Sequence, residues 1–359
     1  MPIFAGETHS HPMSLRSFAP LLIDWYHRHQ RPLPWRHTRD PYRIWLSEII
    51  LQQTRVAQGL PYYHAFVEAF PDVFALAAAE ERAVLRLWQG LGYYSRARNL
   101  HKCARLVATQ WRGAFPTTYA QLLTLPGVGP YTAAAIASFA FGEAVPVVDG
   151  NVFRVVARVF GLDTDIAHAD AKKLFFERAQ SVMDPARPAD FNQAMMELGA
   201  VCCTPSSPTC EVCPVRKICF AYKHEAQKLL PVKSKKTKVR KRYLHYFVIR
   251  QKDKTLLRER TGKDIWRGLY DFYCVETSRP ARLEKLLAAD PFLSRVRITQ
   301  ISQPVKHMLS HQQLRAVFYE GVFRRAKTPL PQGLKWYGPK QVAALPKPVL
   351  IDGYLKGRA

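Results

Sequence analysis

The sequence predicts two domains, an all-α domain over residues 15–224 and an α+β domain over residues 243–359. Three observations support this division. Apolar residues recur at helical spacing in the first region, a basic segment follows at residues 225–242, and aromatic and aliphatic residues then alternate as in strands. A chain of 359 residues with 48% apolar composition is long enough for two cores. Residues 1–14 are expected to form a disordered tail.

The first predicted helix has one apolar face, formed by residues three and four positions apart. These are Phe18, Leu21, Leu22, Trp25 and Tyr26. Asp40 and Pro41 supply an N-cap and a first-turn proline for a second helix, which is expected to run through Gln53. Further helices are expected at residues 61–69, 80–90, 95–112, 131–141, 151–160, 170–183 and 190–201.

The segment between the domains is strongly basic. Residues 228–242 hold eight Lys or Arg side chains and no acid. Such a run repels itself, so it is predicted to be an extended linker, either a solvated tether or one that contacts phosphates. After it, Tyr243–Ile249 and Leu314–Phe323 have the β-branched and aromatic composition of strands.

The whole chain carries 53 Lys and Arg against 28 Asp and Glu, a net charge of +25. This charge favours a nucleic-acid partner over a merely soluble basic surface or a patch for anionic lipid. No apolar run approaches the roughly 18 residues that a membrane-spanning helix needs. Residues 1–14 lack the pattern of a secretory signal. We therefore expect a soluble, cytoplasmic monomer that does not bind membranes.

Residues 126–130, Pro-Gly-Val-Gly-Pro, join an apolar helix end to an Ala-rich helix. Gly127 and Gly129 allow backbone angles and close approaches that a Cβ would prevent. The amides of this turn and of the following helix start are expected to bind one phosphate. The alternative is an ordinary corner between two helices.

Four of the seven cysteines lie within seventeen positions, which is unlike a secreted disulfide framework. Cys203, Cys210, Cys213 and Cys219 are separated by six, two and five residues. Structural zinc is the competing interpretation, but zinc sites usually contain two closely spaced cysteine pairs. The uneven spacing favours a [4Fe–4S] cluster, which we expect to shape a basic loop and not to act in electron transfer.

Two carboxylates are candidates for acid and base chemistry. Glu48 shares an apolar helical face with Trp45, Ile49 and Gln52, so its pKa is expected to be raised and the group to act as a general acid. Asp149 precedes a helix, where amide donors are expected to keep it ionised. Each has a plainer explanation, a hydrogen-bonded structural glutamate and an N-cap aspartate.

Five segments together resemble the adenine DNA glycosylase (MutY) family of the helix-hairpin-helix superfamily. They are WLSEIILQQT, GLGYYSRARNL, LPGVGPYT, VDGNVFRV and the cysteine spacing, and the resemblance covers residues 15–224. It implies a two-lobed helical fold with Glu48 and Asp149 in the active site between the lobes. The partner it implies is double-stranded DNA with adenine opposite 8-oxoguanine or guanine.

The resemblance also assigns supporting roles. Tyr131 and Asn151 would assist the two carboxylates, while Gln53 and Tyr93 would wedge into the duplex. Weaker candidates for the adenine pocket are Arg31, Trp35 and Gln193. Plain core packing is the alternative for both Tyr93 and Trp35.

Related enzymes that also cut the DNA strand carry a lysine directly after the hairpin, where this chain has Tyr131. Without that amine no Schiff base forms with the sugar at this site. The sequence therefore predicts base removal without efficient strand cleavage. Two alternatives remain open: an endonuclease III-type lyase and a non-catalytic iron–sulfur protein that binds DNA.

Residues 255–272 resemble the start of the Nudix-like C-terminal domain of the same family. No acidic run suited to magnesium binding is present, so pyrophosphatase activity is not expected. A Phe-Ser-His loop reads the oxidised guanine in the family, and this chain has Leu309, Ser310 and His311. The alternative is an ordinary surface loop.

Overall fold

The computed structural model describes residues 16–234, 239–309, 311–324 and 328–357. The tail predicted at residues 1–14 lies outside the described residues. The chain folds into two compact units. One comprises residues 1–63, 70–77 and 102–235, and the other comprises residues 64–69, 78–101 and 236–359.

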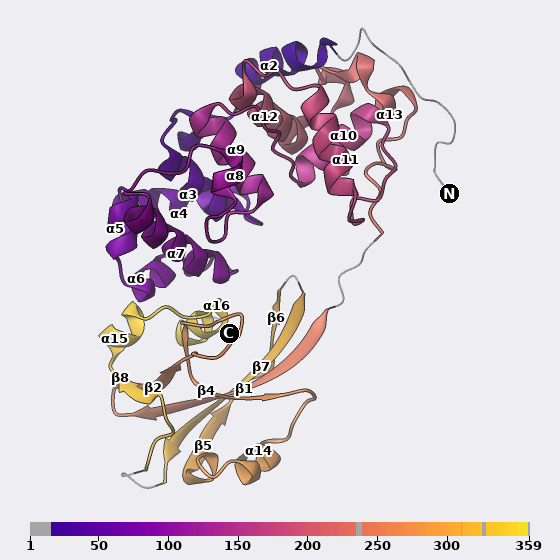
Figure 1. Cartoon of the computed structure of the whole chain (residues 1–359). Coiled ribbons are helices and arrows are strands. Elements are labelled where there is room, and N and C mark those ends of the chain that lie inside the picture. Colours follow the sequence, from indigo (N-terminus) through magenta and orange to yellow (C-terminus); the bar gives the residue numbers. More distant parts are fainter. Residues whose placement is uncertain (1–15, 235–238, 310, 325–327, 358–359) are drawn as a thin grey trace. The chain divides into compact units, whose positions relative to one another are not determined.

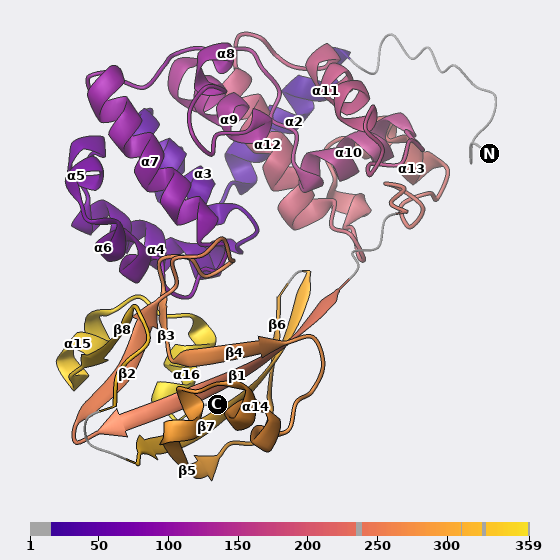
Figure 2. The ribbon, with the colours of Figure 1, turned by 60° about the horizontal axis from the view of Figure 1, so that its bottom comes forward.

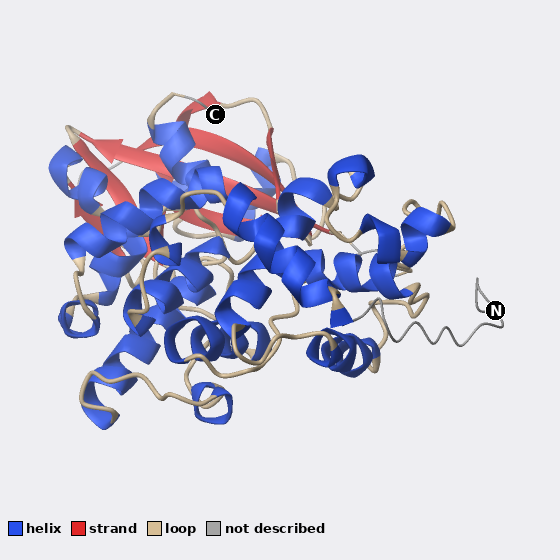
Figure 3. Cartoon of the chain, turned by 90° about the horizontal axis from the view of Figure 1, so that it is seen from above, coloured by secondary structure: helices blue, strands red, loops and turns tan. Residues whose placement is uncertain are grey.

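All secondary structure described before residue 239 is helical (Figures 1 and 3). The α-helices are α2 (Phe18–His29), α3 (Pro41–Leu51), α4 (Val56–Ala69), α5 (Val73–Ala78), α6 (Glu81–Leu87), α7 (Ser95–Gln110), α8 (Tyr119–Leu122), α9 (Pro130–Phe141), α10 (Gly150–Phe160), α11 (Ala171–Ser181), α12 (Pro188–Glu197) and α13 (Phe220–Lys223). Short turns of other helix types are η1 (Pro34–Arg36), η2 (Leu198–Cys202), η3 (Cys210–Val212) and η4 (Arg216–Ile218), of which η2 is a π-helix.

Local signals explain where several of these helices begin and end. Asp40 caps α3 by accepting a hydrogen bond from the Tyr42 amide at 2.9 Å, as predicted. The same helix ends at Leu51, two residues earlier than expected, because Gln53 adopts a left-handed φ of 57°. Gly161 closes α10 with a φ of 69°.

The helices α2 and α10–α13 share one apolar core. Phe18, Leu22, Val155, Phe175 and Phe191 are fully buried in it. The predicted apolar face of α2 is confirmed except at Leu21, which is 42% exposed. Because α12 packs against both α2 and α9, it links this core to the hairpin that precedes α9.

Residues 240–337 contain an eight-stranded sheet (Figure 2). Its strands are β1 (Arg240–Gln251), β2 (Lys254–Glu259), β3 (Tyr270–Asp271), β4 (Tyr273–Thr277), β5 (Val296–Ile301), β6 (Val305–Met308), β7 (Gln312–Phe323) and β8 (Leu334–Tyr337). The strand order is β3-β2-β1-β7-β5, and β1 and β7 are parallel. Outside this order, β4 pairs with β1, β6 with β7 and β8 with β2. The two strands predicted from composition are confirmed as β1 and β7.

Residues alternate between the two faces of β1, as the strand period of two requires. Phe247 and Ile249 face a core that includes Leu286 of α14 (Leu283–Ala289). On the other face, Tyr246 stacks on Phe318 with ring centroids 5.3 Å apart. Tyr354 of α16 (Val349–Leu355) covers Phe318 at 4.0 Å. The remaining helices of this region are η5 (Leu293–Arg295) and α15 (Pro339–Ala344).

The predicted linker, residues 225–242, differs from the expectation at both ends. Ala226 and Leu230 are buried in the helical core, and strand β1 already begins at Arg240. Arg242 is 7% exposed because Asp264 and Glu276 neutralise it, at 3.1 and 2.6 Å. Net charge along the sequence does not reveal such distant partners. No helix in the described parts of the chain is long and apolar enough to cross a membrane.

Candidate active site

Glu48 lies on α3 and is only 5% exposed, despite its charge. The net pKa of its carboxyl is raised to about 7, mainly by burial and in smaller part by nearby Asp149. A hydrogen bond from Tyr131 and the positive charge of Arg36 lower it. Since burial dominates, a large fraction of Glu48 is protonated near neutral pH, as a general acid requires.

Tyr131 follows Pro130 in the first turn of α9, directly after the glycine turn. It hydrogen-bonds Glu48, and its hydroxyl lies 4.0 Å from the Met196 sulfur. Burial and the neighbouring carboxylates raise its pKa well above the usual value, so Tyr131 is neutral. The neutral phenol donates a hydrogen bond to the Glu48 carboxyl group and orients it.

Asp149 is the N-cap of α10, as the sequence predicts. Its Oδ1 accepts hydrogen bonds from the amides of Asn151 and Val152, both at 2.8 Å, and its Oδ2 accepts one from the Asn151 side chain at 2.9 Å. As expected, these donors favour the ionised form of Asp149 by lowering its pKa. Burial outweighs the amide donors and Arg154, so the net effect on the pKa of Asp149 is upward.

The support of Asp149 extends through Asn151 to Arg154, which sequence reasoning missed. Arg154 donates to the Asn151 side-chain oxygen at 2.9 Å, to the Gly199 carbonyl at 2.6 Å and to the Cys203 carbonyl at 2.6 Å. Both carbonyls lie in or directly after the π-turn η2. A Cβ on Gly199 would lie 2.6 Å from the Asn151 Cβ, so only glycine allows this packing.

Arg31, a candidate for the adenine pocket, is paired inside the protein. It donates to both carboxylate oxygens of Glu197, at 2.7 and 2.6 Å. Arg36 donates to Glu197 as well, at 2.6 Å. Burial would raise the pKa of Glu197, but the two arginines outweigh it and hold the value at about 2. Sequence reasoning missed Glu197 and Arg36 because they lie 161 residues apart.

The other two pocket candidates are also held by neighbours. Trp35 is 8% exposed and contacts Tyr63 edge-on, with ring centroids 5.1 Å apart. Gln193 accepts a hydrogen bond from the Tyr26 hydroxyl. The Arg36 guanidinium lies 5.5 Å from the centre of the Tyr26 ring, so Arg36 contacts both Tyr26 and Glu197.

The glycine turn has the geometry expected of a phosphate-binding hairpin. Gly127 has a φ of 77°, which is strained for any residue with a Cβ. Gly129 is the N-cap of α9, and no atom lies within 4 Å of where its Cβ would be. The helix start is therefore open to an approaching anion.

Gln53 and Tyr93, the predicted wedge residues, share an unusual backbone conformation. Their φ angles are 57° and 47°, in the left-handed region that non-glycine residues seldom adopt. Gln53 is exposed and Tyr93 is 41% exposed. Exposed residues held in a strained conformation are typical of functional sites.

The four predicted cluster cysteines line one cavity beside the α10 residues Val155 and Arg158. The guanidinium of Arg158 is buried and donates to the Cys203 sulfur at 3.3 Å. It also donates to four backbone carbonyls, those of Thr204, Pro205, Gln227 and Leu230. Within the described ranges, no group of three or more His, Cys, Asp or Glu side chains is arranged to hold a single metal ion.

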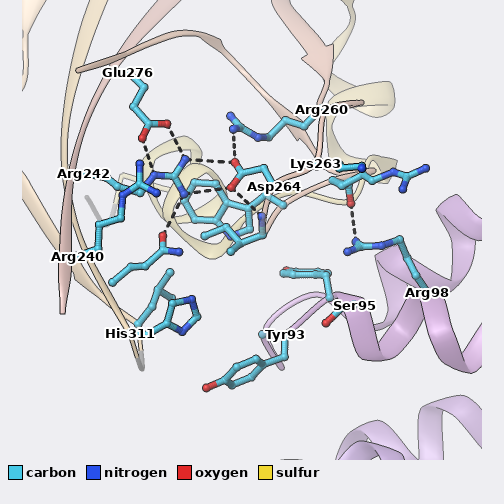
Figure 4. A pocket seen from close by; sticks show the side chains of 18 of the residues that line it. Tyr93, Ser95, Arg98, Arg240, Arg242, Arg260, Lys263, Asp264, Glu276 and His311 are labelled. Carbon is cyan, nitrogen blue, oxygen red and sulfur yellow. Dashed lines mark hydrogen bonds and ion pairs between the residues drawn. The ribbon is translucent and has the colours of Figure 1, made fainter. Parts of the chain in front are cut away.

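Leu309 and His311 lie at the turn between β6 and β7, while Ser310 is outside the described residues. Both line a pocket of about 1080 Å³, and Tyr93 lines it too (Figure 4). The volume slightly exceeds that of a typical small-molecule site. Arg240 and Lys263 also face this pocket, which suits a segment of nucleic acid.

The carboxylates beside this pocket are engaged by arginines. Arg242 binds Asp264 and Glu276, and Arg260 binds Asp264 (Figure 4). Arg260 also binds Asp271, at 2.6 Å. These acids therefore serve ion pairing within the fold.

Comparison with known proteins now defines the family. Residues 46–181 match the model of the HhH-GPD superfamily base excision DNA repair proteins, and residues 245–357 match the NUDIX domain. Adenine DNA glycosylase of Buchnera aphidicola subsp. Baizongia pistaciae is 35% identical over 72% of this chain and 74% of its own length. The chain belongs to the adenine DNA glycosylase family. The human adenine DNA glycosylase is 45% identical over 60% of this chain and 41% of its own.

Solved structures share the fold of the helical region. A thermostable thymine-DNA glycosylase matches 59% of this chain and 98% of its own, with 30% identity and a TM-score of 0.55. Endonuclease III in a non-covalent DNA complex covers 60% of this chain and 98% of its own at 20% identity and a TM-score of 0.52, which shows a shared fold. The predicted fold class is confirmed, and so is the prediction of a DNA glycosylase.

The raised pKa of Glu48 has a measurable effect on stability. The folded protein binds this proton more tightly than the unfolded chain, so its stabilising effect is complete below pH 4.5 and is lost as the pH rises through about 7. We expect Glu48→Gln to gain stability over the wild type between pH 4.5 and 8, by roughly 2–3 kcal/mol at about 1.4 kcal/mol per pKa unit. Urea unfolding of both proteins at pH 4.5 and 8 measures this difference.

The matched control is Glu68→Gln, which alters an exposed glutamate of α4. Its difference from the wild type should stay constant between the two pH values. A pH-independent difference for Glu48→Gln would show that Glu48 is ionised normally in the fold.

Proposed function

We propose that this glycosylase removes adenine mispaired with 8-oxoguanine or guanine in double-stranded DNA and leaves an abasic site without cutting the strand. The observation that carries the proposal is the environment of the buried Glu48, whose pKa is about 7. Glu48 is hydrogen-bonded to the neutral Tyr131 and lies near Asp149, the N-cap of α10. Two carboxylates in different environments are typical of glycosidic bond hydrolysis.

In this mechanism the adenine first leaves the base stack, at a cost of a few kcal/mol that a mispair lowers. Glu48 donates its proton to the adenine ring as the bond to the sugar breaks and the ring takes the bonding electrons. Asp149 stabilises the positive charge on the sugar until water adds at the same carbon, and a carboxylate of the site, Glu48 or Asp149, accepts the proton that the water loses. The amide donors hold the Asp149 carboxylate in place, so it does not need to reorganise.

The arginines around Glu197 are proposed to frame the adenine pocket. Arg36 lies close enough to Glu48 to lower its pKa, and Arg31 and Arg36 share the Glu197 carboxylate. Trp35 and Gln193 flank this cluster. The network would orient the base with a fixed set of charges and exclude water from Glu48.

Strand cleavage should be weak, because Tyr131 occupies the position of the lyase lysine and its hydroxyl is engaged by Glu48.

Iron–sulfur binding is a further part of the proposal. The four predicted cluster cysteines line one cavity, and their uneven spacing in the sequence suits a cube better than a single zinc ion. Cys203, Cys210, Cys213 and Cys219 would hold the cluster. When bound, it would brace the loop that carries Arg216 and Lys217.

The donors toward the sulfurs fit a thiolate-bound cluster. Arg158 donates to Cys203, and the side chain of Gln227 lies 3.9 Å from the Cys210 sulfur. Hydrogen bonds to ligand sulfurs stabilise their negative charge. Lys217 is exposed, while Arg216 is bound to Glu211, so Lys217 is the freer cation for a phosphate.

Recognition of the base opposite adenine is assigned to the β6–β7 turn. Because most adenines in DNA are paired with thymine, safe excision requires a second contact on the opposite strand. Ser310 and His311 carry hydrogen-bonding groups, and a good base contact is worth about 1–3 kcal/mol of discrimination. Leu309 supplies apolar contact without aromatic stacking, so its wedge should be weaker than that of a phenylalanine.

The first prediction concerns this discrimination. The double variant Ser310→Ala, His311→Ala should slow adenine excision opposite 8-oxoguanine about tenfold or more, since two base contacts are lost. Excision opposite guanine should slow much less. Single-turnover rates on the two duplexes measure the ratio, with Glu48→Gln as the variant that binds DNA without excision. The exposed His168→Ala is the matched control, and equal slowing on both duplexes would mean that the turn supplies only general affinity.

The second prediction concerns strand cleavage. Borohydride reduces a Schiff base between enzyme and DNA to a permanent cross-link, so the wild type should be trapped poorly. Tyr131→Lys should be trapped more, because it places an amine at the position of the lyase lysine. Cross-linked product on a denaturing gel gives the yield, and Tyr131→Phe is the control without an amine. Efficient trapping of the wild type would show that another amine acts.

The third prediction concerns the cysteines. Purified protein should contain iron and acid-labile sulfide, and Cys203→Ala should lose both. Cys202→Ala is the closest control, because Cys202 lines the same cavity and contacts Cys213 and the Thr209 carbonyl, yet is not a predicted ligand. Iron retained in Cys202→Ala but lost in Cys203→Ala would show that Cys203 is a ligand and the adjacent Cys202 is not. A colourless protein with stoichiometric zinc would contradict the cluster assignment.

A further inference from the structure

Residues 78–101 and 236–359 belong to the same compact unit, although more than 130 residues separate them along the chain. A row of contacts joins the two segments along α6, the following loop and the start of α7. Leu85 packs closely against Gly268, because a Cβ added to Gly268 would lie only 2.8 Å from the Leu85 Cδ1 atom. Gly268 also has a φ of 81°, which favours glycine. Arg98 donates to the Arg267 carbonyl at 2.8 Å (Figure 4).

Lys347, near the end of the chain, lies at the centre of this row. Its backbone amide donates to the Gln89 side chain at 2.9 Å, and its carbonyl accepts from the Tyr94 hydroxyl at 3.4 Å. Lys347 is 2% exposed, and its ammonium turns inward to the carbonyls of Val342 and Leu345. The side chain of Lys347 is therefore held by neighbouring carbonyls, while its backbone amide and carbonyl bind Gln89 and Tyr94.

Gln89 makes a second contact with the same region. Its side chain hydrogen-bonds the Asp352 carboxylate on α16. Asp352 also binds Lys356 at 2.7 Å. Gln89 thus binds the segment Leu345–Asp352 at two places, Lys347 and Asp352. Leu345, Leu350 and Ile351 of this segment are buried.

The loop between Gln89 and Tyr94 carries Tyr93. Its φ angles are positive at Gly90 (110°), Gly92 (73°) and Tyr93 (47°), and the last of these is strained because Tyr93 carries a Cβ. Trp88 donates from its indole to the Gly92 carbonyl at 2.9 Å. The Arg96 guanidinium lies 5.0 Å from the Trp88 ring and 5.6 Å from the Tyr93 ring. A strained loop persists only where surrounding contacts hold it, and here both flanking residues bind Lys347.

We propose that the segment Leu345–Asp352 is a clamp that positions Tyr93, so that Tyr93 and the β6–β7 turn meet the duplex as one rigid body. The proposal rests on the proposed wedge role of Tyr93. Tyr93 and His311 line one pocket, so a shift of either would change the space available to the opposite strand. Gln89, Lys347 and Asp352 are positioning residues in this device.

The decisive comparison is Asp352→Ala with Asp352→Asn. Both lose the ion pair to Lys356, but only the asparagine keeps an acceptor for Gln89. Gln89→Ala removes the contact from the other side, and Gln110→Ala, an exposed glutamine at the end of α7, is its control. Amide hydrogen exchange at residues 91–95 reports the loop, and 2-aminopurine fluorescence beside the mispair reports the wedge.

Asp352→Ala should raise exchange at residues 91–95 by about 2–10-fold, the effect of losing one hydrogen bond. Gln89→Ala loses two hydrogen bonds and should raise exchange at least as much. Exchange in β1 and β7 should not change. The same variants should reduce 2-aminopurine unstacking and slow excision opposite 8-oxoguanine by a similar factor, while Asp352→Asn and Gln110→Ala resemble the wild type.

Unchanged exchange at residues 91–95, or a rise that extends through β1 and β7, would overturn the clamp. The Tyr93→Ala variant tests the wedge role separately. If it leaves fluorescence and excision unchanged while Gln89→Ala still loosens the loop, the wedge role fails and the clamp stands.

Discussion

Removal of water from the Glu48 carboxyl is the constraint on which the rest of the helical unit depends. A carboxyl that is 5% exposed is tolerable only when it is neutral or well bonded, and its pKa of about 7 reflects the balance between burial and the Tyr131 hydrogen bond. The hairpin before α9 places Tyr131 against α3, while the cap of α10 places Asp149 nearby. Packing of α9 on α3 is thus a requirement of the chemistry as well as of the core.

Buried arginines connect the site to its surroundings. Arg154 joins Asn151, which holds Asp149, to the carbonyl of Cys203, and Arg158 joins the cysteine loop to the segment that leaves the helical core. Each guanidinium is buried and donates mainly to carbonyl oxygens. Such a network leaves little freedom, because an arginine that lost its acceptors would remain as an unpaired buried charge.

The Nudix-like region uses the same kind of interaction for another purpose. Asp264, Asp271 and Glu276 pair with Arg242 and Arg260, so these carboxylates stabilise the sheet beside the pocket. Arg240 and Lys263 also line the pocket. A fold known for nucleotide chemistry thereby presents a surface suited to recognition.

Short-range patterns in the sequence determined much of this protein. The Asp40-Pro41 helix start, the glycine turn at Gly127 and Gly129, the N-cap at Asp149 and the strands β1 and β7 depend on neighbouring residues, so they were predictable. The wider site residues, including Arg31, Gln53 and Tyr93, came from resemblance to a family and not from local chemistry. Their backbone and partners were visible only in the structure.

Tertiary structure alone decided the long-range pairings. Arg36 and Glu197 lie 161 residues apart, and Gln89 and Lys347 lie 258 apart, so no local pattern brings them together. The same reason explains the basic segment, where Arg242 is buried because Asp264 and Glu276 reach it from other parts of the sheet. The pKa of Asp149 also depended on the fold, since its amide donors are local but its burial comes from packing with distant helices. Sequence specifies which groups are available, and packing decides which of them lose water and which partners they meet.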